Sequence, residues 1–259
     1  MSWKAKCGKF VSGHAPRAWL ALQIARRDRH FEPEYWLLPR LTRRDANSVD
    51  VGGNAGQYAY YLSRLTRAVH VFEPNPICLA QLARVRRGNM IVHDVALSDH
   101  HGEATMRFDP NNTGVGTIEG ANRLDRNPGI TSVVERRVKI CPLDDLHLEN
   151  VAFIKIDVEG HEPSVLRGAV NLIGRDKPVL LIEIERRHNS VAFNQVDDLL
   201  ASVGYRAWRL SQGVLIPVRG DEIDRLQPLP LTQGQEYVNN FIFLPAERLP
   251  SFSGLTNYP

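Results

Sequence analysis

The stretch Val49–Gly56, with the sequence VDVGGNAG, joins an apolar run to three glycines and then to a helical pattern that continues to Leu65. Glycine permits a tight turn and the close approach of a ligand, and the start of a helix offers unpaired backbone N–H groups. The stretch therefore predicts a strand, a turn and a helix, the first unit of a parallel α/β sheet. By itself it fits a ligand-binding turn and a turn without ligand equally well.

The residues that follow continue this alternation of strand and helix. Apolar runs at 68–72, 90–92, 151–156 and 179–185 predict parallel strands, and helical patterns begin at 76, 162 and 191 and end near 85, 173 and 203. Three extended segments, 206–210, 214–218 and 241–244, predict an antiparallel group at the end of the sheet. The pattern predicts a doubly wound α/β domain with helices on both faces of one sheet.

Outside this framework the sequence predicts three accessory regions. Residues 1–45 are expected to form a helical cap, with a helix over 16–30, on a main domain of residues 46–250. The Pro-rich tail, 251–259, is expected to fray. Two short strands, 105–108 and 136–140, flank the polar segment Asn111–Gly120, which is predicted to be a loop. That loop forms either part of a lid over a substrate or an ordinary surface loop.

Composition places the 259-residue chain among ordinary globular proteins, with 43% hydrophobic and 24% charged residues. The formal net charge of +3 gives no reason to expect nucleic acid as a partner. The apolar runs are too short to span a bilayer, and no secretory signal is predicted. Three widely spaced cysteines show no disulfide or metal-ligand spacing, and their scarcity favours the cytoplasm.

Positive charge is concentrated near the amino terminus. The residues concerned are Arg26, Arg27, Arg29, Arg40, Arg43 and Arg44. Such a run is most often a solvated helix face. The alternative is a weak contact with an anionic membrane surface or attraction to a phosphorylated substrate.

The glycine turn differs from a dinucleotide-binding turn. Gly52, Gly53 and Gly56 lack the G-x-G-x-x-G spacing, and Asp50 precedes them on the strand. A carboxylate there suits a sulfonium or an ammonium better than a pyrophosphate. Glu73 follows Gly53 by twenty positions, at the end of the second strand, where an acid can accept hydrogen bonds from ribose hydroxyls. Alternatively, Glu73 caps the helix that begins at Pro76.

Two further segments carry polar side chains at strand ends. Asp94 follows the third strand, where it can accept a hydrogen bond from an exocyclic amine. Asp157, Glu159 and His161 follow the strand 151–156, and Glu183 lies on the next strand. Carboxylates and a histidine this close together are a credible acid–base or metal-ligand cluster.

The sequence resembles the FkbM-type methyltransferases over roughly residues 32 to 245. The resemblance rests on Phe31–Glu34, Val49–Gly56, Phe72–Asn75, Val95–Asp99, Leu143–Leu146, Lys155–Gly160 and Leu166–Ala169. It implies the seven-stranded, Rossmann-like sheet of class I methyltransferases and binding of S-adenosyl-L-methionine. The implied cofactor-binding residues are Asp50, Gly52, Asn54, Gly56, Glu73, Asp94, Ala96 and Asp157. His161 departs from the family pattern, which more usually has an apolar or small residue there.

The resemblance also implies the reaction. A methyl group would pass to a hydroxyl of a sugar, glycolipid or polyketide-like acceptor. Asp157 is the first candidate to orient or deprotonate that hydroxyl, with Glu159 and His161 in support. A divalent metal on Asp157 and Glu183 is the alternative, and oxygen ligands alone suit Mg²⁺. The rival functions are a nicotinamide-dependent oxidoreductase and a non-catalytic nucleoside-binding module on the same fold.

Overall fold

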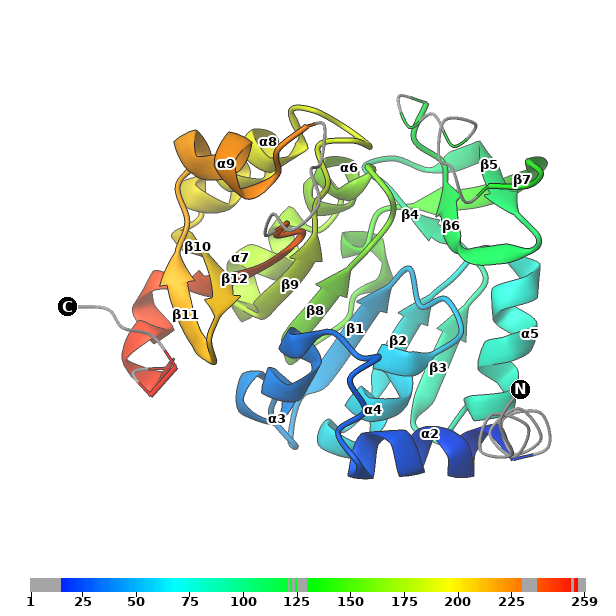
Figure 1. Cartoon of the computed structure of the whole chain (residues 1–259), viewed down its shortest axis with the longest axis horizontal. Coiled ribbons are helices and arrows are strands. Elements are labelled where there is room, and N and C mark those ends of the chain that lie inside the picture. Colours follow the sequence, from blue (N-terminus) through cyan, green and yellow to red (C-terminus); the bar gives the residue numbers. More distant parts are fainter. Residues whose placement is uncertain are drawn as a thin grey trace.

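A computed structural model describes residues 15–120, 122, 124, 130–229, 237–252, 254 and 255 of the chain. Its centre is an eight-stranded sheet in the order β11-β10-β12-β9-β8-β1-β2-β3 (Figure 1). The strands are β1 (Asn47–Val51), β2 (Val69–Phe72), β3 (Met90–His93), β8 (Val151–Ile156), β9 (Val179–Glu183), β10 (Tyr205–Ser211), β11 (Val214–Pro217) and β12 (Asn240–Pro245). Strands β1, β2, β3, β8 and β9 are parallel, whereas β12 runs antiparallel between β9 and β10. This confirms the predicted parallel sheet with an antiparallel end, and β11 adds an eighth strand at that edge.

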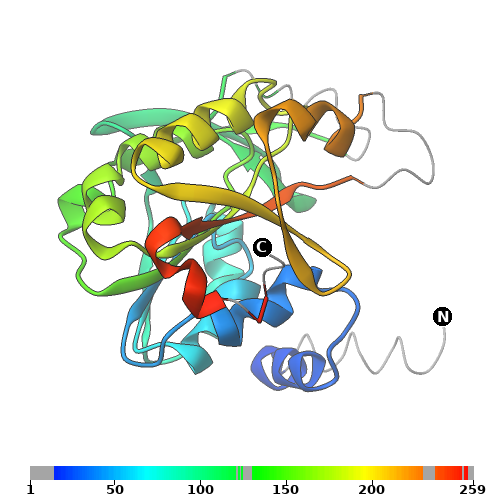
Figure 2. The same cartoon turned by 90° about the vertical axis from the view of Figure 1, so that its left-hand side faces the viewer.

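Helices cover both faces of the sheet, as Figure 2 shows from the β11 edge. They are α2 (Pro16–Ala25), α3 (Leu38–Leu41), α4 (Gln57–Leu65), α5 (Pro76–Val85), α6 (Glu162–Arg167), α7 (Val170–Asp176), α8 (Ala192–Ser202) and α9 (Ile223–Leu226), with 3₁₀ turns η1 (Pro33–Leu37), η3 (Asp144–Leu146), η4 (Gly220–Glu222) and η5 (Ala246–Phe252). One core lies beneath α6, α7 and α8, and the other beneath α2, α4 and α5. Burial on both faces explains why the central strands are continuously apolar.

The alternation of side chains along β1 and β8 decides which polar groups meet. Val49 and Val51 pack into the core beneath α8, so Asp50 points to the α4 face. On β8, Ile154 and Ile156 point to the α8 side, which leaves Lys155 on the α4 side. The register pairs Asp50 directly with Lys155. An acid and a base are thus buried side by side in the middle of the sheet.

A second sheet replaces the helix that would follow β3 in a regular alternation. It has the order β4-β7-β5-β6, with β4 (Ala96–Leu97), β5 (Gly102–Asp109), β6 (Asn112–Thr117) and β7 (Val134–Cys141). Strands β5 and β7 confirm the two short strands that were predicted here. The loop predicted at Asn111–Gly120 is wrong, because most of it forms β6, which pairs with β5. Glycine obscured the strand pattern, although Gly116 is a packing residue: a Cβ there would lie 2.8 Å from Met106.

Two predicted helices are shorter than expected. The helix 16–30 ends at Ala25, where Arg27 takes a left-handed conformation (φ 48°) and Asp28 N–H donates to the Gln23 carbonyl. The helix 162–173 is broken into α6 and α7 at Gly168. A Cβ on Gly168 would lie 2.0 Å from the Ser98 carbonyl oxygen, so close backbone packing accounts for that glycine.

The two ends of the described chain join the core beneath α4. Leu20, Ile24 and Tyr35 of the amino-terminal cap are buried against it. In the carboxyl-terminal tail, Phe252 and Leu255 are buried in the same core, and residues 256–259 lie outside the described part. Among the described residues, none of the helices has the length and apolar character needed to cross a bilayer.

Candidate functional site

A pocket opens where the carboxyl ends of β1, β2 and β8 meet β6 of the second sheet. The empty space within it, including the open mouth, is about 620 Å³. It is lined by Val51, Gly52, Asn54, Phe72, Glu73, Pro74, Asn75, Cys78, Ala96, Leu97, Met106, Thr113, Gly114, Gly116, Ile118, Asp157, Val158, Glu159 and His161. Ligands of open α/β sheets bind at this end of the strands.

The turn after β1 brings backbone, without side chains, to one wall of the pocket. Gly52 has φ 76°, and a Cβ there would lie 1.9 Å from the Asp157 carbonyl oxygen. Gly56 has φ 85° and caps α4, where a Cβ would meet Val85 at 2.8 Å. Gly52 lines the pocket, whereas Gly56 is required for packing and lies outside the lining.

We expect Gly52→Ala to destabilise the protein and not only to weaken ligand binding. The methyl group would collide with the backbone of Asp157, just after β8, and the left-handed conformation is costly for alanine. Strain and overpacking together predict a loss of at least about 2 kcal/mol in the free energy of unfolding. Urea unfolding measures it, with Gly88→Ala as the control, because a Cβ at Gly88 meets nothing within 4 Å. Equal stability of the two variants would contradict this account.

Glu73 directly follows β2 and presents its carboxylate to the pocket. Oε2 accepts a hydrogen bond from Asn54 N–H at 2.7 Å, and Oε1 accepts one from Asn75 N–H at 2.7 Å. The side chain is only 4% exposed, and burial raises the pKa of Glu73 to about 7. Each oxygen retains a lone pair, so the carboxylate can accept two further hydrogen bonds from a diol. Asn75, not Glu73, caps α5, through a bond from Ile77 N–H to its side chain.

Asp50 lies below the pocket and does not line it. It is fully buried, and neither carboxylate oxygen has a hydrogen-bond partner of good geometry among the described residues, although the Ala59 N–H weakly favours the charged form. Burial raises the pKa of Asp50 to about 6, against the opposing effect of Lys155. Asp50 therefore contributes negative charge beneath the glycine turn and does not form part of the pocket wall.

Lys155 and Asp157 form a buried ion pair beside the pocket. Lys155 Nζ donates to Asp157 Oδ2 at 2.8 Å and lies 4.9 Å from the centre of the Tyr58 ring. Burial disfavours the charged ammonium, but the carboxylates of Asp157 and Asp50 outweigh it and raise the pKa of Lys155. Asp157 remains 29% exposed and lines the pocket, so its second oxygen is available to a ligand.

The turn after Asp157 holds a second group of acids. Glu159 has φ 55°, an unusual conformation for a side chain of this size, and its Oε2 lies 3.0 Å from His188 Nε2. Burial, reinforced by Asp157, raises the pKa of Glu159 to about 8. Glu162 is 1% exposed and accepts the Gly160 N–H at 2.9 Å, which fixes the turn. Strained backbone that is held in this way is typical of functional sites.

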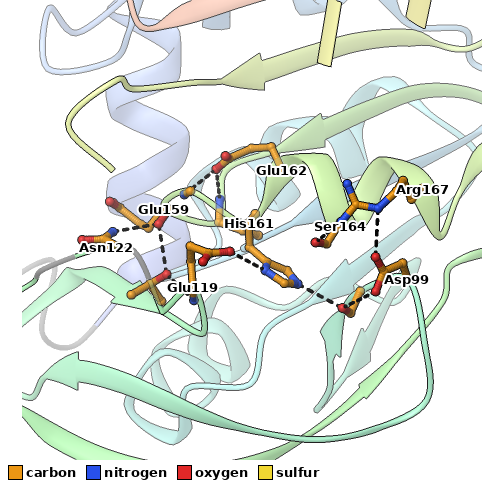
Figure 3. Close-up of polar contacts among 12 residues, drawn as sticks. Asp99, Glu119, Asn122, Glu159, His161, Glu162, Ser164 and Arg167 are labelled. Carbon is orange, nitrogen blue, oxygen red and sulfur yellow. Dashed lines mark hydrogen bonds and ion pairs between the residues drawn. The ribbon is translucent and has the colours of Figure 1, made fainter. Parts of the chain in front are cut away.

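Both ring nitrogens of His161 are engaged (Figure 3). Nε2 lies 3.0 Å from Ser98 Oγ, and Nδ1 lies 3.3 Å from Glu119 Oε2. Because a carboxylate only accepts, these partners assign the proton to Nδ1 and make Nε2 the acceptor from Ser98. Burial lowers the pKa of His161 against the opposing effect of Glu119. The structure thus makes His161 a neutral bridge between three segments, with no nitrogen left over to act as a base.

Two further bonds join the same segments. The Glu159 carbonyl oxygen accepts from Thr117 Oγ1 at 3.0 Å and from Asn122 Nδ2 at 2.7 Å (Figure 3). The end of β6 is therefore tied to the turn that follows β8. Residues of both segments line the pocket.

Comparison with known proteins identifies the family of the chain. The sequence model described as the methyltransferase FkbM domain matches residues 50–207, which is more than half of the chain and includes the glycine turn, Glu73 and the Asp157 turn. The chain belongs to the FkbM methyltransferase domain family. The match confirms the resemblance seen in the sequence and favours it over a nicotinamide-dependent oxidoreductase.

Two relatives show how much of this FkbM-family chain is shared. "Methyltransferase 1" of Beauveria bassiana (strain ARSEF 2860) is 28% identical over an alignment of 149 residues, which covers 48% of this chain and 58% of that protein. The crystal structure of Methyltransferase FkbM from Methylobacillus flagellatus KT superposes with a TM-score of 0.52 at 20% identity, over 83% of this chain and 48% of that one. The chain thus spans less than two thirds of each relative, and the second likeness shows the fold.

Within this FkbM-family fold, several predicted site residues fall outside the pocket lining. Asp94 does so, although its neighbours Ala96 and Leu97 line the pocket. Glu183 also lies outside the lining and accepts a hydrogen bond from Asn239 Nδ2 at 2.7 Å. Burial, with Asp157 nearby, raises the pKa of Glu183. In the described part of the chain, no group of three or more His, Cys, Asp or Glu side chains is arranged to hold a metal ion.

The buried acid Glu162 predicts a dependence of stability on pH. Burial raises its pKa from 4.5 to about 7, so between these values the folded protein keeps a proton that the unfolded chain has lost. The free energy of unfolding should therefore fall as the pH rises through this window, by about 1 kcal/mol per pH unit for one such group. Glu162→Gln should flatten the slope measured by urea unfolding, whereas Glu247→Gln, at an exposed site, should not. An unchanged slope in Glu162→Gln would refute the assignment.

Proposed function

We propose that this chain is an S-adenosylmethionine-dependent O-methyltransferase that acts on a hydroxyl of a sugar, glycolipid or polyketide-like acceptor. One observation carries the proposal. A single pocket brings together Glu73, suited to a ribose diol, and Asp157, suited to a hydroxyl, at the carboxyl ends of β2 and β8, the two strands that flank β1. Membership of the FkbM methyltransferase domain family supports the class of reaction.

The residues present fit S-adenosylmethionine. Glu73 has one backbone donor on each oxygen and lone pairs left for the two ribose hydroxyls. Gly52 keeps side chains away from the turn, and Asp50 lies beneath it without a hydrogen-bond partner of good geometry among the described residues. The bound cofactor supplies an electrophilic methyl group on a positively charged sulfur. Nearby carboxylates favour such a cation, more so where water is excluded.

The acceptor side is built around Asp157. Lys155 fixes one carboxylate oxygen of Asp157, so the other is held in a defined direction for the acceptor hydroxyl. We assign Asp157 the orientation of that hydroxyl and the removal of its proton as the new bond forms. Burial raises the pKa of Glu159 to about 8, so this lining residue is also able to exchange a proton near neutral pH. His161 supports both indirectly, by holding the pocket walls together.

In the proposal, the predicted amino-terminal cap, residues 1–45, contributes Glu32 to the acceptor side of the pocket. Tyr58 donates to Glu32 Oε2 at 2.6 Å, and Glu32 helps to keep Lys155 charged. Glu183 interacts electrostatically with Lys155 and accepts from Asn239 Nδ2 at 2.7 Å, and such acids and amides are the donors and acceptors that a polyhydroxylated acceptor requires. This is the structural support for a sugar-like acceptor.

A divalent metal on Asp157 and Glu183 remains the alternative way to activate the hydroxyl. Lys155 already supplies a cation to Asp157, which favours activation without a metal. Turnover that is lost with a chelator and restored by Mg²⁺ would establish the metal route. Turnover that a chelator leaves unchanged would establish the carboxylate route.

The experiment that tests the function is a screen of hydroxylated acceptors with S-adenosylmethionine, read by mass spectrometry as the gain of one methyl group. Calorimetry with S-adenosylhomocysteine and with a nicotinamide dinucleotide tests the cofactor separately. Binding of the first alone is expected. Binding of the dinucleotide alone would overturn the proposal, and cofactor binding without any methylated product would favour the nucleoside-binding module.

A further inference from the structure

A basic surface lies at the end of the sheet opposite the pocket. Three segments build it: residues 15–30 with α2, residues 62–70 at the end of α4, and residues 84–90 at the end of α5. They contain the arginines Arg17, Arg26, Arg27, Arg29, Arg64, Arg67, Arg84, Arg86 and Arg87, and all nine are exposed. Asp28 is the single acidic residue in these segments. Figure 1 shows α2 lying across the lower ends of α4 and α5.

Contacts between the segments make this one surface and not three separate runs. The Arg17 guanidinium donates to the Arg86 carbonyl oxygen and so joins α2 to the end of α5. Asn89 Nδ2 donates to the Ser63 carbonyl oxygen at 3.0 Å, which joins the ends of α5 and α4. The arginines are therefore held on a common face, which we call the basic face.

The charge of the basic face contrasts with the rest of the chain. The whole chain has a formal net charge of only +3, although the basic face alone has nine arginines and one acid. The remainder is therefore net negative, in agreement with the carboxylates around the pocket. Such an asymmetric distribution orients a protein on a charged surface before any specific contact forms.

We propose that the basic face docks on an anionic lipid surface. Anionic headgroups attract clusters of exposed arginines, and guanidinium groups bind phosphate in a bidentate manner. An apolar residue distinguishes this partner from a nucleic acid. Leu22 is 37% exposed on the outer side of α2, one turn before Arg26, where it can enter the headgroup boundary.

The direction of the strands makes this docking compatible with the pocket. The basic face lies at the amino ends of β2 and β3, whereas the pocket opens at the carboxyl ends of β1, β2 and β8. A chain docked through the basic face keeps its pocket mouth turned away from the bilayer. Docking should therefore leave turnover of a water-soluble acceptor unchanged.

The test is sedimentation of the full chain with lipid vesicles. We expect binding to phosphatidylcholine vesicles that contain phosphatidylglycerol, and weak binding to phosphatidylcholine alone. Each arginine near an anionic surface contributes about fivefold to the partition coefficient, so the triple variant Arg26→Gln, Arg29→Gln and Arg64→Gln should lose about 100-fold. The binding should also weaken steeply as salt rises from about 50 to 500 mM.

Two controls separate docking from total charge and from nucleic-acid binding. The triple variant Arg136→Gln, Lys139→Gln and Arg206→Gln removes three exposed charges elsewhere and should bind vesicles nearly as the unmodified chain does. Leu22→Ser should weaken vesicle binding without a change of charge. Equal binding to both kinds of vesicle, or equal losses in the two triple variants, would overturn the proposal. The alternative result is that duplex DNA or RNA displaces the chain from the vesicles at a lower concentration than competing anionic vesicles do. That result would make the basic face a nucleic-acid surface.

Discussion

Replacing Asp157 with asparagine is expected to lower methyl transfer by about 10²–10⁴-fold while S-adenosylmethionine still binds. Asparagine keeps the shape of the side chain but loses the charge that would orient the acceptor hydroxyl and take its proton. The cofactor contacts proposed for Glu73 and the glycine turn are left in place. Single-turnover methyl transfer and calorimetry with S-adenosylhomocysteine measure the two quantities separately.

The ion pair with Lys155 requires a control for stability. Removing the Asp157 charge leaves a buried ammonium, 6% exposed, with less compensation, and that is destabilising whatever the chemistry. The double variant Lys155→Met, Asp157→Asn removes both charges and should recover stability without recovering turnover. Recovery of turnover in the double variant would reduce Asp157 to a partner of Lys155. Near-normal turnover in Asp157→Asn would move the base to Glu159 or Glu183.

The succession of strands along the sequence could be predicted because each strand has a local signal. The apolar run 151–156 is buried at every position, and the glycines at 52, 53 and 56 mark where β1 turns into α4. Such signals depend on residues that are neighbours in the chain. Prediction failed where a glycine is required for close packing. Gly116 made β6 resemble a loop, and Gly168 interrupts the helix that the apolar periodicity predicted over residues 162–173.

The acids of the candidate site could be predicted from the sequence, but the hydrogen bonds that join its segments could not. Glu73 and Asp157 stand at strand ends, so topology alone brings them to one edge. The partners of His161, Ser98 and Glu119, are 63 and 42 residues away in the sequence, and no periodicity relates them. Only the folded chain shows that His161 has both nitrogens engaged, which changes it from a candidate base to a positioning residue.

Glu73→Ala is expected to weaken the binding of S-adenosylmethionine by about 10- to 150-fold. A hydrogen bond to a charged group is worth about 1.5–3 kcal/mol, and the carboxylate would hold both ribose hydroxyls. The change also frees the backbone N–H groups of Asn54 and Asn75, which now donate to it at 2.7 Å each. Calorimetry with S-adenosylhomocysteine gives the affinity, and thermal unfolding shows whether the turn has been kept.

A matched variant distinguishes the ribose contact from the local structure. Glu73→Gln keeps the volume and one acceptor oxygen but replaces the other with a donor, so it can no longer accept from two hydroxyls. It should therefore bind S-adenosylhomocysteine weakly while its stability stays closer to that of the unmodified chain than in Glu73→Ala. If both variants fold and bind with unchanged affinity, Glu73 serves only to tie Asn54 to Asn75. The nucleoside would then have to be held by other residues of the pocket lining, such as Thr113 and Gly114 of β6.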